Sequence, residues 1–467
     1  RARLGCDRMG RLTALAFDGD FETGAYASWG PTVANRVPVH ASGPYRIGAV
    51  AAEARAIHTH GPVAGAFRGF GVPQAAILGE TLMDRLAEAA GIDRLAFRRL
   101  NAFRDGDLTA TGQVLQGVGI AACLDALAGP WAAALGEAAA ANMLGGAERR
   151  GVGVAACWYG CGNTGLPNPS TVRAGITAEG RLVLHQGAAD IGQGANTVIA
   201  QIFADALGAP LAAVEIVGPD TALTPDCGKT SASRQTYVTG RAAAAAGAAL
   251  RAELLRRANL GDGAALAFEG GAVTLREGGE TRRLDPARWG RDARGYALSV
   301  EESYDPPTTA LDEAGQGVPY AVYGWGAQIA EVAVDPALGT VRVLGITAAH
   351  DLGRVVNPLL AEGQIEGGIA QGLGLALMEE YLPGRTENLH DYLIPTTGDM
   401  PEIRSILLEV PDPEGPFGAK GLGEHALIPT APAILNAIRH ATGAEIDRLP
   451  ALPHRVLAAI DRAEGRA

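Results

Sequence analysis

The chain has 467 residues and a formal net charge of −12, from 39 Lys and Arg against 51 Asp and Glu. This length allows roughly two to four domains, and the hydrophobic content of 47% excludes wholesale disorder. An acidic chain without a stripe of Lys and Arg is a poor match for nucleic acid or for an anionic membrane, because both need clustered positive charge.

Residues 1–148 are expected to form a first subdomain. Residues 1 to about 60 alternate short apolar runs with Gly, Asp and Pro turns, which is typical of strands. Helical spacing of apolar residues predicts a helix over 74–100, and the alanine-rich segment 126–146 predicts another that ends at a Gly-Gly pair. We place a domain boundary near residues 145–150.

Residues 149–467 are expected to form a second subdomain. Residues 261–300 have weak periodicity and are expected to be a surface excursion, and a proline-broken tail ends the chain. The other elements expected here are strands at 151–158, 175–186 and 214–217, a helix after Gly194, a helix over 240–260, a strand pair over 323–334 and 341–349, and helices over 363–380 and 429–442.

The cysteines and the apolar segments indicate the cellular compartment of the protein. An odd, scattered set of cysteines in a large protein does not suggest a disulfide framework and favours a reducing compartment. No segment is apolar over the length that a bilayer requires, and no signal-peptide pattern opens the chain. We therefore expect a cytoplasmic protein. The five cysteines are Cys6, Cys123, Cys157, Cys161 and Cys227.

Glycine-rich loops recur along the chain, each with an embedded amide, hydroxyl or charged group. None has the lysine of a phosphate-binding P-loop or the strand–GxGxxG–helix arrangement of a nicotinamide enzyme. A single loop of this kind is most simply a turn, but several that converge can hold a polar cofactor by its ring edges and its phosphate. The loops lie at 65–71, 187–194, 228–240, 363–374 and 418–424.

Four motifs in these loops occur in a fixed order. They are AFRGFG followed by Pro73-Gln74, GQG at 192–194, EGQIEGG at 362–368 and KGLGE at 420–424. This ordered set closely resembles the molybdenum-binding subunit of the xanthine dehydrogenase and aldehyde oxidase family, over the C-terminal part of that subunit. The resemblance implies an α+β fold, a mixed α/β molybdopterin-binding module with two elongated subdomains at 1–148 and 149–467, the second of which carries the catalytic base.

The resemblance also implies residue roles around a molybdopterin-type cofactor. Glu424 corresponds to the general base, which must be ionised and within hydrogen-bond reach of the reacting oxygen; the simpler alternative is a solvated loop glutamate. Arg68 corresponds to an arginine beside the pterin, and no protein side chain is expected to bind the metal directly. The positions implied to hold the pterin and its phosphate are Ile191, Gly192, Gln193, Ala232, Ser233, Arg234, Gln235, Gln364 and Gly423.

Four further residues are expected to contact the substrate. Phe70 resembles the aromatic residue that stacks on substrate. Arg36 lies four residues before His40, as an arginine does in purine hydroxylases of the family, and its guanidinium could neutralise charge on a heterocycle. The alternative for Arg36 is a buried arginine that supports its loop. Trp158 or Tyr159 is expected to supply a stacking face.

The implied function is that of a molybdenum hydroxylase subunit. It would hydroxylate an electron-poor carbon of a purine or related N-heterocycle with water as the oxygen source. Aldehyde oxidation to a carboxylate and a non-catalytic assembly role are the alternatives. The partners that the resemblance implies are the N-terminal molybdenum-binding portion or subunit, a [2Fe-2S] subunit and an FAD subunit. A separate [2Fe-2S] subunit also agrees with the five cysteines, which lack iron–sulfur spacing.

Overall fold

Long apolar strands build the central sheet. In the computed structural model, which describes residues 1–466, these strands are β4 (Arg149–Gly160), β12 (Tyr323–Val334), β13 (Val341–Asp351) and β14 (Glu402–Leu408). Their order is β14-β13-β12-β4, with β12 antiparallel to both neighbours and β14 parallel to β13. Nearly every residue of β4 and β12 is buried, so both faces of the sheet are covered. The predicted strand pair is confirmed.

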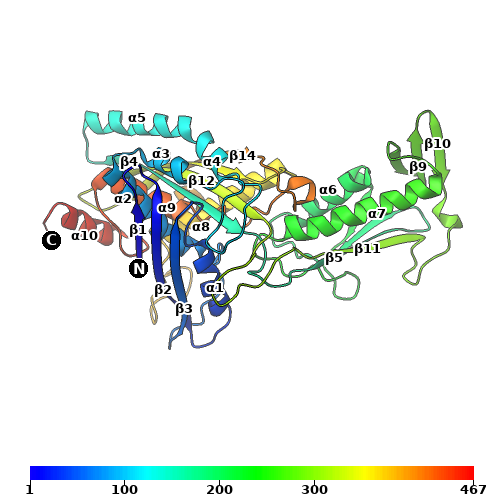
Figure 1. Cartoon of the computed structure of the whole chain (residues 1–467), viewed down its shortest axis with the longest axis horizontal. Helices are drawn as coiled ribbons and strands as arrows, with labels where there is room; N and C mark the ends of the chain where they lie inside the picture. Colours follow the sequence, from blue (N-terminus) through cyan, green and yellow to red (C-terminus); the bar gives the residue numbers. More distant parts are fainter. Residues whose placement is uncertain (467) are drawn as a thin grey trace.

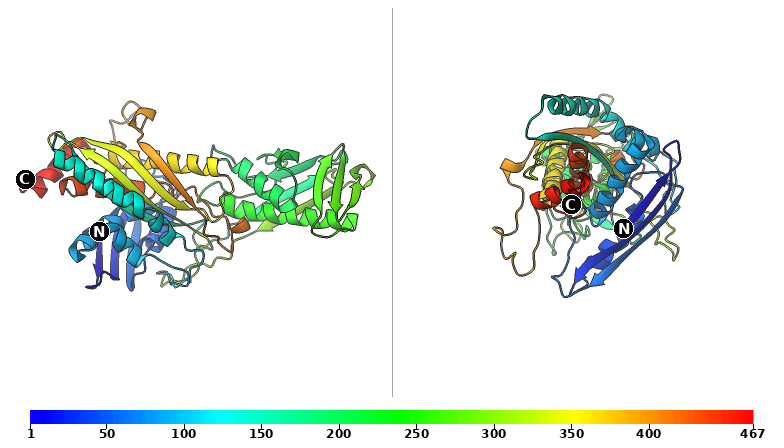
Figure 2. Two further views of the ribbon diagram at one scale, coloured as in Figure 1. Left: turned by 90° about the horizontal axis from the view of Figure 1, so that it is seen from above. Right: turned by 90° about the vertical axis from the view of Figure 1, so that its left-hand side faces the viewer.

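Helices cover the two faces of this sheet (Figure 2). On one face lie α8 (Pro358–Leu377) and α9 (Thr430–Thr442), and on the other lie α4 (Ile120–Ala126) and α5 (Ala128–Leu144). The predicted helices 126–146, 363–380 and 429–442 are thus confirmed. None of the helices in residues 1–466 combines the length and apolarity that a bilayer-spanning helix needs.

The proline-broken tail is a correction, because it contains α10 (Pro453–Ala463). Pro453 lies in the first turn of this helix, where the missing N–H of proline costs nothing. The buried side chains of Val456 and Ile460 attach α10 to the core that α8 and α9 also share.

A second sheet opens the chain, with strand order β1-β2-β3. Its strands are β1 (Ala2–Cys6), β2 (Leu12–Gly24) and β3 (Ala49–His58). The expectation of strands alone over residues 1–60 is wrong, because α1 (Gly30–His40) lies between β2 and β3. Pro31 is compatible with the first turn of α1, while Pro38 within it hides the helical signal in the sequence. Arg36 therefore lies on a helix and not in a loop.

The single helix predicted over 74–100 is two helices. They are α2 (Val72–Ala90) and α3 (Arg94–Asn101). Gly91 ends α2 in a left-handed conformation with φ of 65°, and the Asp93 carboxylate caps α3 by accepting a hydrogen bond from the Ala96 N–H at 2.9 Å.

A distal lobe extends away from these two sheets, which gives the molecule its elongated shape (Figure 1). Its main sheet has the order β11-β5-β6-β7 and packs against two helices through a core of its own. The elements are β5 (Ser170–Ile176), β6 (Leu182–Gln186), α6 (Ala195–Leu207), β7 (Val214–Val217), α7 (Gly240–Ala258) and β11 (Leu298–Tyr304). Strands were expected over 175–186, but a hairpin turn at 177–181 separates β5 from β6.

Residues 261–300 are more ordered than the sequence suggests. They contain the first residues of β11 and a three-stranded antiparallel sheet at the far end of the distal lobe, made of β8 (Ala265–Glu269), β9 (Ala272–Glu277) and β10 (Glu280–Leu284). The expected surface excursion is corrected, because Gly-Gly turns at 270–271 and 278–279 join short strands whose periodicity is too brief to detect. The structure also has short helical turns, which are η1 (Leu211–Ala213), η2 (Gln235–Thr239), η3 (Pro286–Arg288), η4 (Thr397–Asp399) and η5 (Pro416–Gly418).

The domain boundary expected at residues 148/149 stays a prediction. The hydrophobic cores show which parts of the chain pack together. One core joins α2–α5 to β4 and β12, so it draws on both sides of residue 148. The distal-lobe core is formed almost entirely by residues 172–275.

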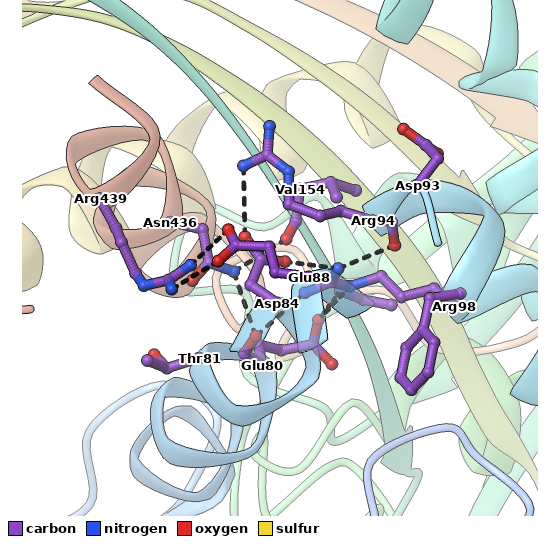
Figure 3. Close-up of polar contacts among 12 residues, drawn as sticks. Glu80, Thr81, Asp84, Glu88, Asp93, Arg94, Arg98, Val154, Asn436 and Arg439 are labelled. Carbon is purple, nitrogen blue, oxygen red and sulfur yellow. Dashed lines mark hydrogen bonds and ion pairs between the residues drawn. The ribbon is translucent and has the colours of Figure 1, made fainter. Parts of the chain in front are cut away.

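A buried ion network joins the helices α2 and α3 to the central sheet and to α9 (Figure 3). Arg98 donates from Nε to Glu80 Oε2 and from Nη1 to Asp84 Oδ1, both at 2.7 Å, and all three side chains are nearly inaccessible. Glu80 Oε2 also accepts from the Ala156 N–H at 3.0 Å, and Asn436 Nδ2 bridges the carbonyls of Glu80 and Val154. These contacts tie α2 and α3 to β4 and α9.

Candidate active site

Backbone amides from two loops hold the carboxylate of Glu424. Its Oε2 accepts a hydrogen bond from the Gly69 N–H, and its Oε1 accepts one from the Ala232 N–H at 3.1 Å. The N–H of Glu424 in turn donates to Ser233 Oγ at 2.8 Å. Three motifs that are far apart in the sequence therefore meet at one half-buried carboxylate, whose orientation they fix.

The backbone beside Glu424 is strained. Phe70, Ala232 and Ser233 have left-handed conformations with φ of 51°, 55° and 57°. Residues with side chains rarely adopt such values, which cost about 1–3 kcal/mol each and concentrate at functional sites. At this site, Ala232 carries one of the amides that bind Glu424, and Phe70 and Ser233 directly follow the residues that carry the two amides. Gly421 is needed for the same approach, because a Cβ there would lie 1.9 Å from the Ser233 carbonyl oxygen.

A cavity of about 560 Å³ has Glu424 in its wall. This volume suits a small organic ligand, and the lining is rich in amide side chains, hydroxyls and main-chain groups. Of the predicted cofactor residues, it includes Arg68, Ile191, Gly192, Gln193, Ser233, Arg234, Gln235, Gln364 and Gly423, while Ala232 lies beside it and binds Glu424. Lining residues absent from the sequence prediction are Thr230, Ser231, Thr236, Gln371, Gly421 and Leu422. Gln371 had a signal, since it lies seven residues after Gln364 on the same helical face.

Arg68 connects three of the motifs. Its Nε donates to the Gly423 carbonyl, its Nη2 to both Gln364 oxygens at 3.1 and 3.2 Å, and its Nη1 to Gln371 Oε1 at 3.2 Å. Burial lowers the Arg68 pKa, and the nearby Glu424 carboxylate opposes this shift. The result is a fixed cation in the cavity wall, of the kind that binds phosphate through charge-assisted hydrogen bonds.

The other cavity loops are ordered by their own side chains. Gln193 Oε1 accepts from the Ile191 N–H at 2.7 Å, and Gln235 Nε2 donates to Thr230 Oγ1 at 3.1 Å. Arg234 is buried and donates from Nη2 to the carbonyls of Asn168 and Pro169 at 2.9 and 2.7 Å. The loops are thus preformed, and the donors and acceptors around the cavity fit a polar pterin with a phosphate.

Lys420 anchors the segment that ends at Glu424. Its side chain is fully buried, donates to the Gly117 carbonyl at 2.6 Å and pairs with Asp351. Asp351 Oδ1 accepts from the amides of Gly353 and Val410, both at 2.9 Å. The start of the 420–424 motif is therefore fixed to the ends of β13 and β14.

Three of the four predicted substrate residues come together beside Glu424. Arg36 is 3% exposed, and its guanidinium carbon lies 4.6 Å from the ring centre of Tyr159 and 5.4 Å from that of Phe70. Its Nη1 and Nη2 donate to the carbonyls of Gly160 and Gly162 at 2.9 and 2.5 Å. These three residues lie near the cavity but do not line it.

Trp158 lies elsewhere. It faces the opposite side of β4 from Tyr159, is 1% exposed and stacks on Tyr323 with ring centres 4.8 Å apart. The placement of Trp158 in the hydrophobic core therefore does not support a substrate contact, and Tyr159 is the residue of this pair that reaches Arg36.

His40 supports Arg36 from behind. Its Nε2 accepts from the Gly160 N–H and its Nδ1 donates to the Arg36 carbonyl, both at 3.0 Å, which fixes the neutral tautomer. Burial, and then the adjacent Arg36 charge, lower the pKa of His40 to about 3. His40 is therefore a neutral structural residue at physiological pH.

Comparison with known proteins gives this site its class. Two family models, both described as a molybdopterin cofactor-binding domain, match residues 1–102 and 127–401. Fold, cavity and family models together define a molybdopterin-binding protein. The chain is also 34% identical to the putative xanthine dehydrogenase molybdenum-binding subunit of Escherichia coli (strain K12), over 97% of this chain and 61% of the relative.

Two further comparisons show the family to which the chain belongs. The chain is 33% identical to the aldehyde oxidoreductase of Megalodesulfovibrio gigas, over 98% of this chain and 48% of the relative. The crystal structure of the aldehyde oxidoreductase from Desulfovibrio desulfuricans superimposes with a TM-score of 0.86 at 30% identity, covering 98% of this chain and 48% of that one. The chain belongs to the xanthine dehydrogenase and aldehyde oxidase family of molybdopterin-binding proteins, and the expected α+β fold is confirmed. It spans about half to three fifths of the length of these relatives.

Proposed function

We propose that the chain is the catalytic part of a molybdenum hydroxylase that acts on an electron-poor carbon of a purine or related N-heterocycle, with water as the oxygen source. The observation that carries this proposal is the carboxylate of Glu424, held by two backbone amides in the wall of a cavity that fits a pterin. A bound molybdopterin-type cofactor supplies two-electron redox chemistry there. Arg68, Gln364 and the loops at 191–193 and 230–235 would hold it.

The residues of the chain supply the proton chemistry and the orientation. Glu424 accepts, on a carboxylate oxygen, the proton that the attacking oxygen loses as it bonds to carbon. The amides of Gly69 and Ala232 keep this carboxylate from rotating away. Phe70, held between Gly69 and Gly71, offers an aromatic ring next to the base for a planar substrate.

Metal and pterin analysis of the purified complex, with a dye-reduction screen of purines, nicotinate and aldehydes, tests this function. We expect molybdenum and pterin in equal amounts and dye reduction with at least one heterocycle. A cofactor-replete complex that oxidises none of these compounds would favour the non-catalytic assembly role.

Arg36 discriminates between a heterocycle and an aldehyde as substrate. Its Nε is a buried donor without a partner in residues 1–466, which supports a contact with substrate. Its two Nη atoms, however, bind the Gly160 and Gly162 carbonyls, and this observation favours loop support and hence the aldehyde alternative.

We expect Arg36→Met to lower purine-type turnover by an amount equivalent to roughly 2–4 kcal/mol of transition-state stabilisation, because the charge opposite the ring is lost. Oxidation of small aldehydes should change little. The measurement is kcat/KM for one purine and one aldehyde in the same preparation. Equal losses for both substrates would mean that Arg36 only supports the backbone at 160–162.

We also propose that the cofactor is enclosed together with further polypeptide, namely the N-terminal molybdenum-binding portion or subunit, and that [2Fe-2S] and FAD partners remove electrons. The relatives are longer than this chain, and Ile191 at the cavity is 77% exposed. Expressed alone, the chain should be poorly soluble or free of molybdenum, because an exposed cofactor surface favours aggregation. Co-expression with the upstream portion and an iron–sulfur subunit should restore both properties. A soluble monomer that binds molybdopterin stoichiometrically and reduces dye would contradict this proposal.

A further inference from the structure

Lysine is rare in this chain. Of its 39 basic Lys and Arg residues, only Lys229 and Lys420 are lysines, and both lie in glycine-rich loops that contact Glu424 or its neighbours. An ammonium is a compact charge on a flexible stem, whereas a guanidinium is planar and rigid. Lys420 is buried and pairs with Asp351, but Lys229 is exposed and forms no ion pair within residues 1–466. The role of Lys420 is structural, which leaves that of Lys229 to be explained.

The Lys229 ammonium lies over Trp29, the outer ring of an aromatic pair whose inner ring, Phe70, adjoins a residue that binds Glu424. Its Nζ is 4.6 Å from the ring centre of Trp29, and Trp29 meets Phe70 edge to face with ring centres 6.0 Å apart. Phe70 directly follows Gly69, whose N–H binds Glu424. Trp29 is 39% exposed and Phe70 is half-buried, so these side chains run from the surface toward the base.

The backbone on both sides of this contact is fixed. The Lys229 carbonyl accepts from Gln235 Nε2 at 3.1 Å and from Arg234 Nη1 at 3.2 Å. Trp29 directly precedes α1, and Thr23 Oγ1 holds the preceding turn by donating to the Ala27 carbonyl at 2.7 Å. The backbone positions of Lys229 and Trp29 are therefore set, and the flexible lysine stem can follow a ligand.

We propose that Lys229 and Trp29 form an outer binding position for the negatively charged end of a planar substrate whose ring lies against Phe70. This inference rests on the proposed function and adds a substrate class to it: an aromatic or heteroaromatic compound that carries a carboxylate or similar anionic group away from the reacting carbon. An ammonium over the face of an indole offers such a group a charge partner without loss of ring contact. A cation on a chain with a net charge of −12 is also a local attractor for anions.

Benzoate and benzamide provide the test, since they are planar, are not aldehydes and differ in charge. Their binding to the assembled, cofactor-loaded complex is measured by calorimetry, and their competitive inhibition is measured with whichever substrate the wild-type oxidises. We expect wild-type to bind benzoate about tenfold more tightly than benzamide. Lys229→Gln should make the two affinities equal, whereas Lys229→Arg, which retains the charge, should keep part of the preference.

The matched control is Arg354→Gln. Arg354 is an exposed cation over Phe417, with its guanidinium carbon 5.3 Å from the ring centre, and it lies outside the site. This variant should keep both activity and the benzoate preference. The inference would be overturned if wild-type showed no preference for benzoate, or if Lys229→Gln kept the full preference. It would also be overturned if Lys229→Gln weakened the binding of benzoate and benzamide equally, because Lys229 would then only support the contact between the loops. Calorimetry needs no turnover, so an inactive complex would count against the proposed function alone.

Discussion

A Glu424→Gln complex should retain molybdenum and pterin but lose about 10²-fold or more in turnover, the usual scale for a general base. Glutamine keeps the size of the side chain but cannot accept a proton. It also presents an NH2 group where the structure needs two acceptors, because the amides of Gly69 and Ala232 each donate to one carboxylate oxygen. The measurement is kcat per molybdenum in a dye-reduction assay.

Glu362→Gln is the matched control for this substitution. Glu362 is an exposed glutamate in another of the shared motifs, EGQIEGG, and does not line the cavity. Its replacement should leave kcat unchanged. Full activity in a metal-replete Glu424→Gln complex would show that the base is a different group.

Arg98→Met should cause the largest loss of stability, about 3–5 kcal/mol in the free energy of unfolding, the usual cost of breaking a buried ion pair. Burial disfavours the charged guanidinium, but the carboxylates of Glu80 and Asp84 outweigh this and raise the pKa of Arg98. Methionine would leave the Glu80 carboxylate buried with neutral donors alone. The change is measured by urea denaturation of the complex followed by tryptophan fluorescence.

An exposed ion pair provides the comparison. Arg256 pairs with Glu253 at 2.7 Å, but its side chain is 70% exposed. Arg256→Gln should therefore change the free energy of unfolding by less than about 1 kcal/mol. If Arg98→Met unfolds at the same urea concentration as Arg256→Gln, the network in Figure 3 does not hold the helices to the sheet.

The sequence predicted the long elements and the cavity loops for different reasons. Helices such as α7 carry enough turns for an apolar period to emerge, and the loops carry ordered motifs. The elements that the sequence did not predict are short or interrupted. The helix α1 contains Pro38, and Gly91 divides the helix expected over 74–100. The strands β8–β10 have five or six residues each. In such segments the tertiary contacts, not the local pattern, decide the structure.

The residues expected to contact the substrate show a different limit of prediction from sequence. Trp158 and Tyr159 are neighbours on one strand, so their side chains had to face opposite ways, and strand alternation alone could have excluded one of them. The sequence could not predict that both Nη atoms of Arg36 donate to the carbonyls of Gly160 and Gly162, because these two glycines follow Arg36 by 124 and 126 residues.

The scarcity of lysine also has a practical chemical consequence. Because Lys420 is buried, the lysine that an amine-selective reagent such as a succinimidyl ester reaches on the folded chain is Lys229, alongside the terminal α-amino group. A fluorophore, spin label or affinity handle can thus be attached beside Trp29 without introducing a cysteine or removing other lysines. Within this chain, Lys229 is therefore the lysine through which a label can be placed next to the candidate active site.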